Sequence, residues 1–195
     1  PYPPSRSQAR KWTETVGARL STWVKAEPLQ ILTDRIKTSG VDAKAVVNDD
    51  NIVLEYEAVR SGTAYVRPAV LLEFGARSTG EPAERHRVTC DISDAINDLQ
   101  TPIANPRVMR AERTFWEKAT AIHAYCLRGA FRGGDRYARH WYDLDCLDHT
   151  SIASNAILDR DLAADVAKHK QHFFRENDRD GHVIAYQAAQ SGAFC

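Results

Sequence analysis

The sequence lacks an excess of charge of either sign. Its 195 residues contain 26 lysines and arginines against 26 aspartates and glutamates, so the formal net charge is zero. This balance excludes a globally basic nucleic-acid binder and a protein built around an acidic tail. Long apolar runs are also missing, since no stretch approaches the ~18 residues that a membrane-spanning helix requires. With 43% hydrophobic residues the chain can bury a core, and we expect a globular protein.

Cysteine and methionine are scarce. The cysteines show neither CxxC spacing nor a dense framework: Cys90, Cys126, Cys146 and Cys195. Such scattered thiols favour a reduced, cytoplasmic protein. His123 and Cys126 lie three apart and His140 and Cys146 follow, which leaves a metal site open. Ordinary buried side chains are the simpler interpretation, because zinc ligands are usually spaced more tightly. The only methionine is Met109, so we expect the sequence to be a piece of a longer protein.

The spacing of apolar residues changes character twice along the chain. It predicts helices over residues 5–27 and 29–39, strands over 43–47, 52–59, 65–74 and 87–92, a connection over 93–107, and helices over 111–128, 135–148, 158–174 and 182–190. This order of N-terminal helices, a small antiparallel or mixed sheet and a C-terminal helical bundle indicates an α+β fold. We place a domain boundary between residues 92 and 93.

One lysine and one aspartate stand out among apolar neighbours. The first helix of the bundle has an apolar stripe made of Ala111, Phe115, Ala119, Ile122 and Cys126. Lys118 lies on or beside this stripe, where an ammonium must either snorkel to solvent or find an anion. On the next helix Asp143 is flanked by aromatic residues, which predicts a partly buried, paired carboxylate. A structural ion pair with Arg139, one turn earlier, is the competing explanation for Asp143.

Basic residues concentrate in the same part of the chain. Residues 107–139 contain eight lysines and arginines against three acidic residues, which predicts a surface for a polyanion such as a triphosphate or an RNA backbone.

Glu73 is a further candidate. A carboxylate directly after an apolar strand, here residues 70–72, is a common position for a metal ligand or a general base. A solvent-facing residue of an edge strand explains Glu73 equally well.

Two motifs in the helical part resemble a known family. ERTFWEK at residues 112–118 and RYARHWYDL at residues 136–144 are similar to the C-terminal signature of the AbiEii/AbiGii nucleotidyltransferase toxins, which resemble the polymerase-β-like nucleotidyltransferases. HKQHFF at residues 169–174 also looks like the last helix of that family. The resemblance implies a bacterial toxin–antitoxin or phage-defence (abortive infection) system that transfers NMP from an NTP to an RNA, with tRNA as a candidate acceptor. It also implies Mg²⁺ as the cofactor and a cognate antitoxin as a partner.

The resemblance also implies roles for individual residues. Lys118 would contact the nucleotide phosphates, and Asp143 would be the essential acid that orients this lysine or the substrate. Glu73 would complete the catalytic set as the third strand carboxylate and a metal ligand. The nucleotide would be bound by Arg113, Lys118, Arg136 and Arg139. Residues 1–92 would then be the remainder of the nucleotidyltransferase core, and residues 93–195 a C-terminal helical domain.

The first motif of the family, a Gly-Ser turn followed by a strand DxD, is absent from this sequence. The DxD at residues 143–145 lies on a predicted helix, where its two carboxylates point about 200° apart. Truncation before Pro1 is the simplest explanation. We expect this chain to be inactive by itself, because the DxD supplies the metal clamp for attack on the α-phosphate. The alternatives are a non-enzymatic RNA- or protein-binding module that uses residues 107–139, and a degenerate relative with a structural role.

Overall fold

The chain has the α+β organisation that the sequence predicts, and it divides into two compact units, Pro1–Thr79 and Gly80–Cys195. The computed structural model describes residues 2–3, 5–58, 60, 67–96, 98, 100–129 and 135–191. The predicted boundary between residues 92 and 93 separates a nucleotidyltransferase core from a helical domain. This functional boundary stays a prediction. The boundary between the two packed units lies earlier in the chain, between Thr79 and Gly80.

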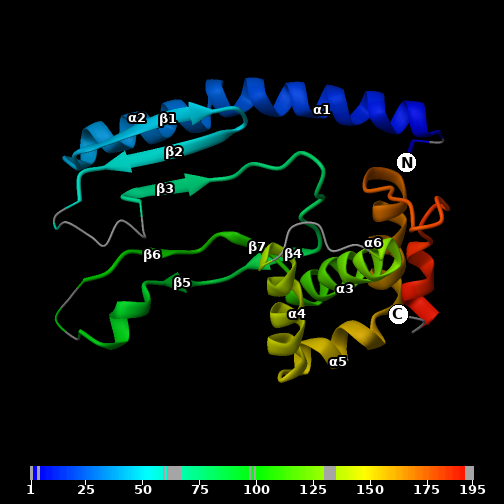
Figure 1. Ribbon diagram of the computed structural model, residues 1–195. Helices are drawn as coiled ribbons and strands as arrows, with labels where there is room; N and C mark the ends of the chain where they lie inside the picture. The colour runs from blue at the N-terminus through cyan, green and yellow to red at the C-terminus, as the bar shows by residue number, and fades with distance from the viewer. Residues whose placement is uncertain are drawn as a thin grey trace. The chain divides into compact units, whose positions relative to one another are not determined.

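The first unit begins with two helices, α1 (Arg6–Ala26) and α2 (Pro28–Ser39) (Figure 1). The Ser5 hydroxyl accepts a hydrogen bond from the Gln8 amide at 3.3 Å, which caps α1. Pro28 begins α2, because the first position of a helix needs no backbone N–H donor. Gly40 ends α2 with a φ of 68°, a left-handed conformation that glycine adopts without strain. Both predicted helices are therefore confirmed to within a residue.

A three-stranded antiparallel sheet follows in the order β1 (Ala43–Asn48), β2 (Asn51–Tyr56), β3 (Ala69–Leu72) (Figure 1). The tight turn between β1 and β2 contains Asp49 with a φ of 54°. The last two strands are shorter than the predicted ranges 52–59 and 65–74. Part of those ranges lies outside the described residues, and Pro68 cannot donate to a ladder. Leu54 pairs with Ala45 on one side and Val70 on the other.

The second unit opens with two short antiparallel ribbons. β4 (Ala83–Arg85) pairs with β7 (Arg107–Met109), and β5 (Val88–Thr89) pairs with β6 (Ile103–Ala104) (Figure 1). A 3₁₀ turn, η1 (Asp91–Asp94), follows β5, so the predicted strand over 87–92 is wrong beyond its first residues. Strands of two or three residues are too short to show an alternation of apolar and polar positions. For that reason the interpretation of 93–107 as a plain connection missed β6 and the start of β7.

Four helices complete the described part of this unit: α3 (Ala111–Arg128), α4 (Asp135–Asp148), α5 (Ser151–Leu158) and α6 (Arg160–Phe173). The predicted ranges of α3 and α4 are confirmed. The predicted helix over 158–174 begins two residues later, where Asp159 accepts a hydrogen bond from the Leu162 amide at 3.0 Å. The sequence analysis missed α5. The predicted helix over 182–190 is instead a 3₁₀ helix, η2 (Tyr186–Ser191).

The core of the second unit forms around α3. Trp116 is 2% exposed, and its indole N–H donates to the Ala156 carbonyl at 2.9 Å. The apolar stripe predicted for α3 is wrong in position, since Ala119 is its one fully buried member and the other four are half-buried. Because α3 packs against α4, α5, α6 and η2, its fully buried face includes Thr120 and His123. Within the described residues, no helix combines the length and apolarity needed to cross a bilayer.

Candidate functional site

The second unit brings Lys118 of α3 and Asp143 of α4 together. The Lys118 Nζ lies 2.7 Å from the Asp143 Oδ2, and the two side chains are 25% and 36% exposed. An ammonium and a carboxylate at this distance form a charge-assisted hydrogen bond. The pair forms because α3 packs against α4 and presents Lys118 beside its buried face. The ammonium and the carboxylate therefore meet as the sequence analysis expects, and both remain within reach of a ligand.

The competing explanation for Asp143, an ion pair with Arg139, is not what the described residues show. The ion pair recorded for Asp143 is the one with Lys118, from the neighbouring helix. Arg139 is exposed on α4 and sits one turn before Asp143. Its guanidinium is therefore on the same helix as the site but does not neutralise the carboxylate.

A second cluster, centred on Glu117, lies directly beside this pair in the sequence. The Glu117 Oε2 is 2.6 Å from the Lys170 Nζ of α6, and its Oε1 is 3.1 Å from the Arg113 Nη2. Arg113 also donates from Nη1 to the Glu81 carbonyl at 2.6 Å, which ties α3 to the segment before β4. We call Arg113, Glu117 and Lys170 the Glu117 cluster. It connects two of the family-like motifs, residues 112–118 and 169–174, to each other and to the segment before β4.

Glu117 is ionised at neutral pH although it is largely buried. Burial alone would raise the pKa of this carboxyl, but the Lys170 ammonium and the Arg113 guanidinium outweigh that effect and hold the pKa below its usual range. Lys170 is further enclosed by the Phe174 ring, whose centroid lies 4.4 Å from its Nζ. Together with the Lys118–Asp143 pair, the region contains three cations and two carboxylates, so it carries one net positive charge.

The sequence analysis did not find Glu117 or Lys170. Glu117 stands inside ERTFWEK and Lys170 inside HKQHFF, so their membership of the two motifs was a signal. Their contact depends on how α3 and α6 pack, and no local spacing shows that. An acidic residue next to Trp116 in one motif, together with a lysine in another motif, could have suggested it.

The arginines predicted to bind the nucleotide differ in how exposed they are. Arg113 is 4% exposed, and its terminal nitrogens bind the Glu81 carbonyl and Glu117. Its contribution to nucleotide binding stays a prediction, and with this burial it would be indirect. The side chain of Arg136 lies outside the described residues, and Arg139 is exposed.

Glu73 lies in the first unit, directly after β3, and its side chain is exposed. Its role as catalytic residue or metal ligand stays a prediction. Among the described residues no group of three or more His, Cys, Asp or Glu side chains could hold a metal ion, and this applies equally to the surroundings of His123 and Cys126. Cys90 and Cys146 are free thiols.

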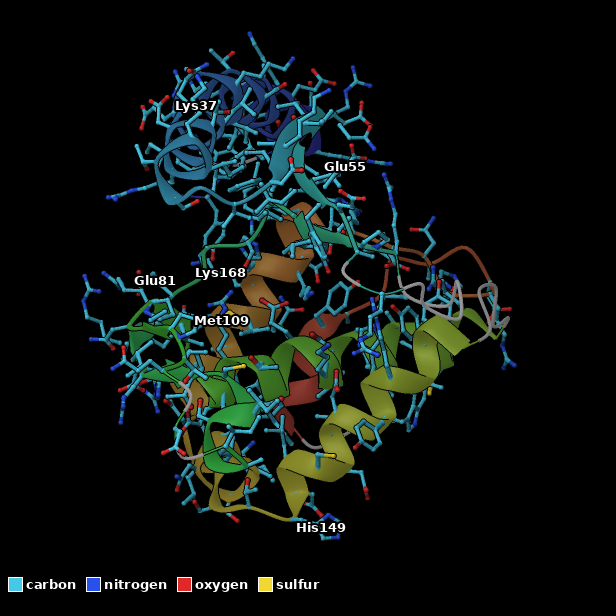
Figure 2. All side chains as sticks on the ribbon, turned by 90° about the vertical axis from the view of Figure 1, so that its left-hand side faces the viewer. Lys37, Glu55, Glu81, Met109, His149 and Lys168 are labelled. Atoms are coloured by element: carbon cyan, nitrogen blue, oxygen red, sulfur yellow. The ribbon has the colours of Figure 1, made fainter. Side chains whose placement is uncertain are left out.

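His140 of α4, which the sequence analysis names only in connection with a metal site, also belongs to this region. It is half-buried and stacks on Tyr125 of α3, with ring centroids 6.0 Å apart and planes at 29°. Burial lowers the pKa of His140, and the positive charges of Lys118 and Arg139 lower it further. The imidazole is therefore neutral at physiological pH. Figure 2 shows the other histidine near this helix, His149, at the far end of α4.

The comparisons with known proteins agree with the motifs. A family model described as "Nucleotidyl transferase AbiEii toxin, Type IV TA system" matches residues 6–192. No curated protein and no solved structure matches this chain. Proteins of this family are nucleotidyltransferase toxins, and they generally use Mg²⁺. Because the match extends over nearly all of its length, the chain belongs to the AbiEii nucleotidyl transferase toxin family of type IV toxin–antitoxin systems.

Proposed function

We propose that this chain carries the phosphate-binding part of a toxin that transfers NMP from an NTP to an RNA acceptor, with tRNA as the first candidate. The observation that carries the proposal is the Lys118–Asp143 ion pair at 2.7 Å. It joins the two motif helices and leaves both side chains partly exposed. In this proposal the toxin acts in the cytoplasm, where NTPs and tRNA are present, and a cognate antitoxin counteracts it.

The chemistry of the pair suits a nucleotide phosphate. A lysine ammonium is a compact point charge with three donors, and it binds phosphate oxygens well. Asp143 takes one of these donors and so fixes the direction of the other two. The single net positive charge of the region favours an anion over a cation. Arg139, exposed on the same helix, would add a second phosphate contact.

Magnesium, which the family generally uses, needs several oxygen ligands at once. The carboxylates near Lys118 do not offer them, because Asp143 binds Lys118 and Glu117 binds Lys170 and Arg113. Glu73, the proposed metal ligand, is one exposed carboxylate in the first unit. The described residues therefore do not by themselves form a magnesium site.

The first test is equilibrium binding of each of the four NTPs to the purified chain. We expect Lys118→Ala to weaken binding at least about tenfold, because the main phosphate contact is lost. The matched control is Lys168→Ala, which removes an exposed lysine of α6 (Figure 2) and should leave the affinity unchanged. Absence of NTP binding by the wild-type chain, or equal losses in both variants, would contradict the proposal.

The second test separates binding from transfer. We expect the gene product that contains these residues to move label from an α-phosphate-labelled NTP to total tRNA. Lys118→Ala and Asp143→Ala should abolish both transfer and toxicity while the protein stays folded. The chain of 195 residues by itself should bind NTP without transfer, since its sequence has no Gly-Ser turn followed by a strand DxD. Toxicity equal to wild type in either variant would refute the assigned roles.

The alternative, a non-enzymatic module that uses the basic residues of 107–139, loses support from the ion pairs of the second unit. Five of those residues bind acidic partners: Arg107 with Glu81, Arg110 with Glu84 and Glu112, Arg113 with Glu117, Lys118 with Asp143, and Arg128 with Glu176. Several of these acids come from outside the window, so the folded surface is less basic than the local sequence.

A further inference from the structure

His140 lies on the same side of α4 as Asp143, because residues three apart on a helix are neighbours on its surface. Its ring is held from the α3 side by the near-parallel stack on Tyr125, with centroids 6.0 Å apart. Its Nδ1 is buried and has no hydrogen-bond partner among the described residues. The imidazole is therefore fixed in orientation next to the Lys118–Asp143 pair while one of its nitrogens is unused.

The charged groups around His140 come from three helices. Lys118 of α3, Arg139 of α4 and Lys170 of α6 all lower the pKa of His140, after burial as the leading cause, and Asp143 opposes them. Tyr125 contributes no charge at neutral pH, because burial raises the pKa of its phenol. Helix α5, which also packs on α4, contains no titratable side chain. What keeps His140 neutral is therefore burial and three cations facing one carboxylate.

We propose that His140 is a proton-responsive residue of this site, which takes up one proton when a triphosphate binds and so adds a positive charge beside the Lys118–Asp143 pair. The proposal rests on the proposed function, since it takes the triphosphate to bind at Lys118. A triphosphate brings several negative charges among the cations that now repel a proton from the imidazole. Once those cations are neutralised by the ligand, protonation of the ring no longer meets the same repulsion. The proton comes from solvent, and no covalent bond changes.

The consequence is a link between pH and affinity. If ligand binding makes the imidazole easier to protonate, then more protons make ligand binding tighter. A change of one pKa unit corresponds to a factor of ten in affinity. We therefore expect the affinity for a triphosphate to rise about three- to tenfold more in the wild type than in His140→Asn on going from about pH 8 to about pH 6.

The experiment uses the full chain and sodium tripolyphosphate, which has no base or ribose. Calorimetric titrations in buffers of different ionisation enthalpy give the number of protons taken up for each ligand bound. The terminal phosphate also titrates in this pH range, but its contribution is common to all variants. We expect the wild type to take up more protons than His140→Asn and His140→Gln. The matched control His149→Asn, at the exposed end of α4 (Figure 2), should behave as wild type.

A second readout is the NMR titration of the His140 ring with and without tripolyphosphate. The pKa of His140 should lie below its ordinary value in the free chain and rise on saturation, whereas that of His149 should not move. Suppose that Lys118→Ala abolishes tripolyphosphate binding, but that the pKa of His140 in the wild type is the same with and without tripolyphosphate. The inference about His140 is then overturned, and the proposed function stands. If wild-type chain binds no tripolyphosphate, both are overturned. The two substitutions of His140 guard against misfolding, which thermal melts would report.

Discussion

Two neighbouring residues of α3, Glu117 and Lys118, enter ion pairs of different character. The Glu117 cluster is enclosed, with the side chains of Arg113, Glu117 and Lys170 exposed by 5%, 19% and 12%. The Lys118–Asp143 pair is more open, at 25% and 36%. Buried ion pairs are costly to break because the remaining charge is left without a partner, whereas partly exposed pairs are weak and easily rearranged. The enclosed cluster therefore holds the helices together, and the open pair is available for a ligand.

The largest effect on stability is expected from removing the centre of the enclosed cluster. Glu117→Ala leaves the Arg113 guanidinium and the Lys170 ammonium buried without their shared anion. We expect the free energy of unfolding to fall by about 3 kcal/mol. Urea unfolding of the full chain measures this loss. Glu84→Ala, an exposed glutamate of the same unit at 3.8 Å from Arg110, is the matched control and should change stability by less than about 0.5 kcal/mol. Equal effects of the two substitutions would show that burial does not distinguish the clusters.

The pH dependence of stability tests the same cluster without deleting atoms. The pKa of Glu117 is lowered in the folded chain by Lys170 and Arg113 despite burial, which acts to raise it. A lowered folded pKa means that the stabilisation is complete above the unfolded pKa and is lost as the pH falls through the folded one. The difference in unfolding free energy between wild type and Glu117→Gln should therefore be largest near pH 7 and shrink toward about pH 3. A difference that stays constant over this range would contradict the assignment.

Local patterns in the sequence were sufficient for part of this site. The apolar periodicity and the glycine at position 129 predict α3, and the aromatic neighbours of Asp143 predict a paired carboxylate. The motif order then places Lys118 and Asp143 on consecutive helices. These features depend on residues that are close together along the chain, and the fold class follows from them as well.

Features that depend on how the helices pack could not be predicted from local patterns in the sequence. The face of α3 that is fully buried is decided by the helices around it, so Thr120 and His123 are in the core although both are polar. Two basic residues of 107–139, Arg107 and Arg128, are paired with Glu81 and Glu176, which lie outside that window in sequence. The contact of Glu117 with Lys170 likewise requires α6 to return to α3.

At the open pair we expect a smaller effect on stability than at the Glu117 cluster. Asp143→Asn keeps the size of the side chain and removes its charge, so the unfolding free energy should change by less than about 1 kcal/mol. The site then gains a net positive charge, and tripolyphosphate should bind at least as tightly as in wild type, with a steeper dependence on salt. Toxicity should nevertheless be lost, because Lys118 is no longer oriented by a carboxylate. Binding titrations and urea unfolding on the same preparation distinguish this orienting role from a structural one. A loss of stability as large as that of Glu117→Ala would mean that the open pair is structural.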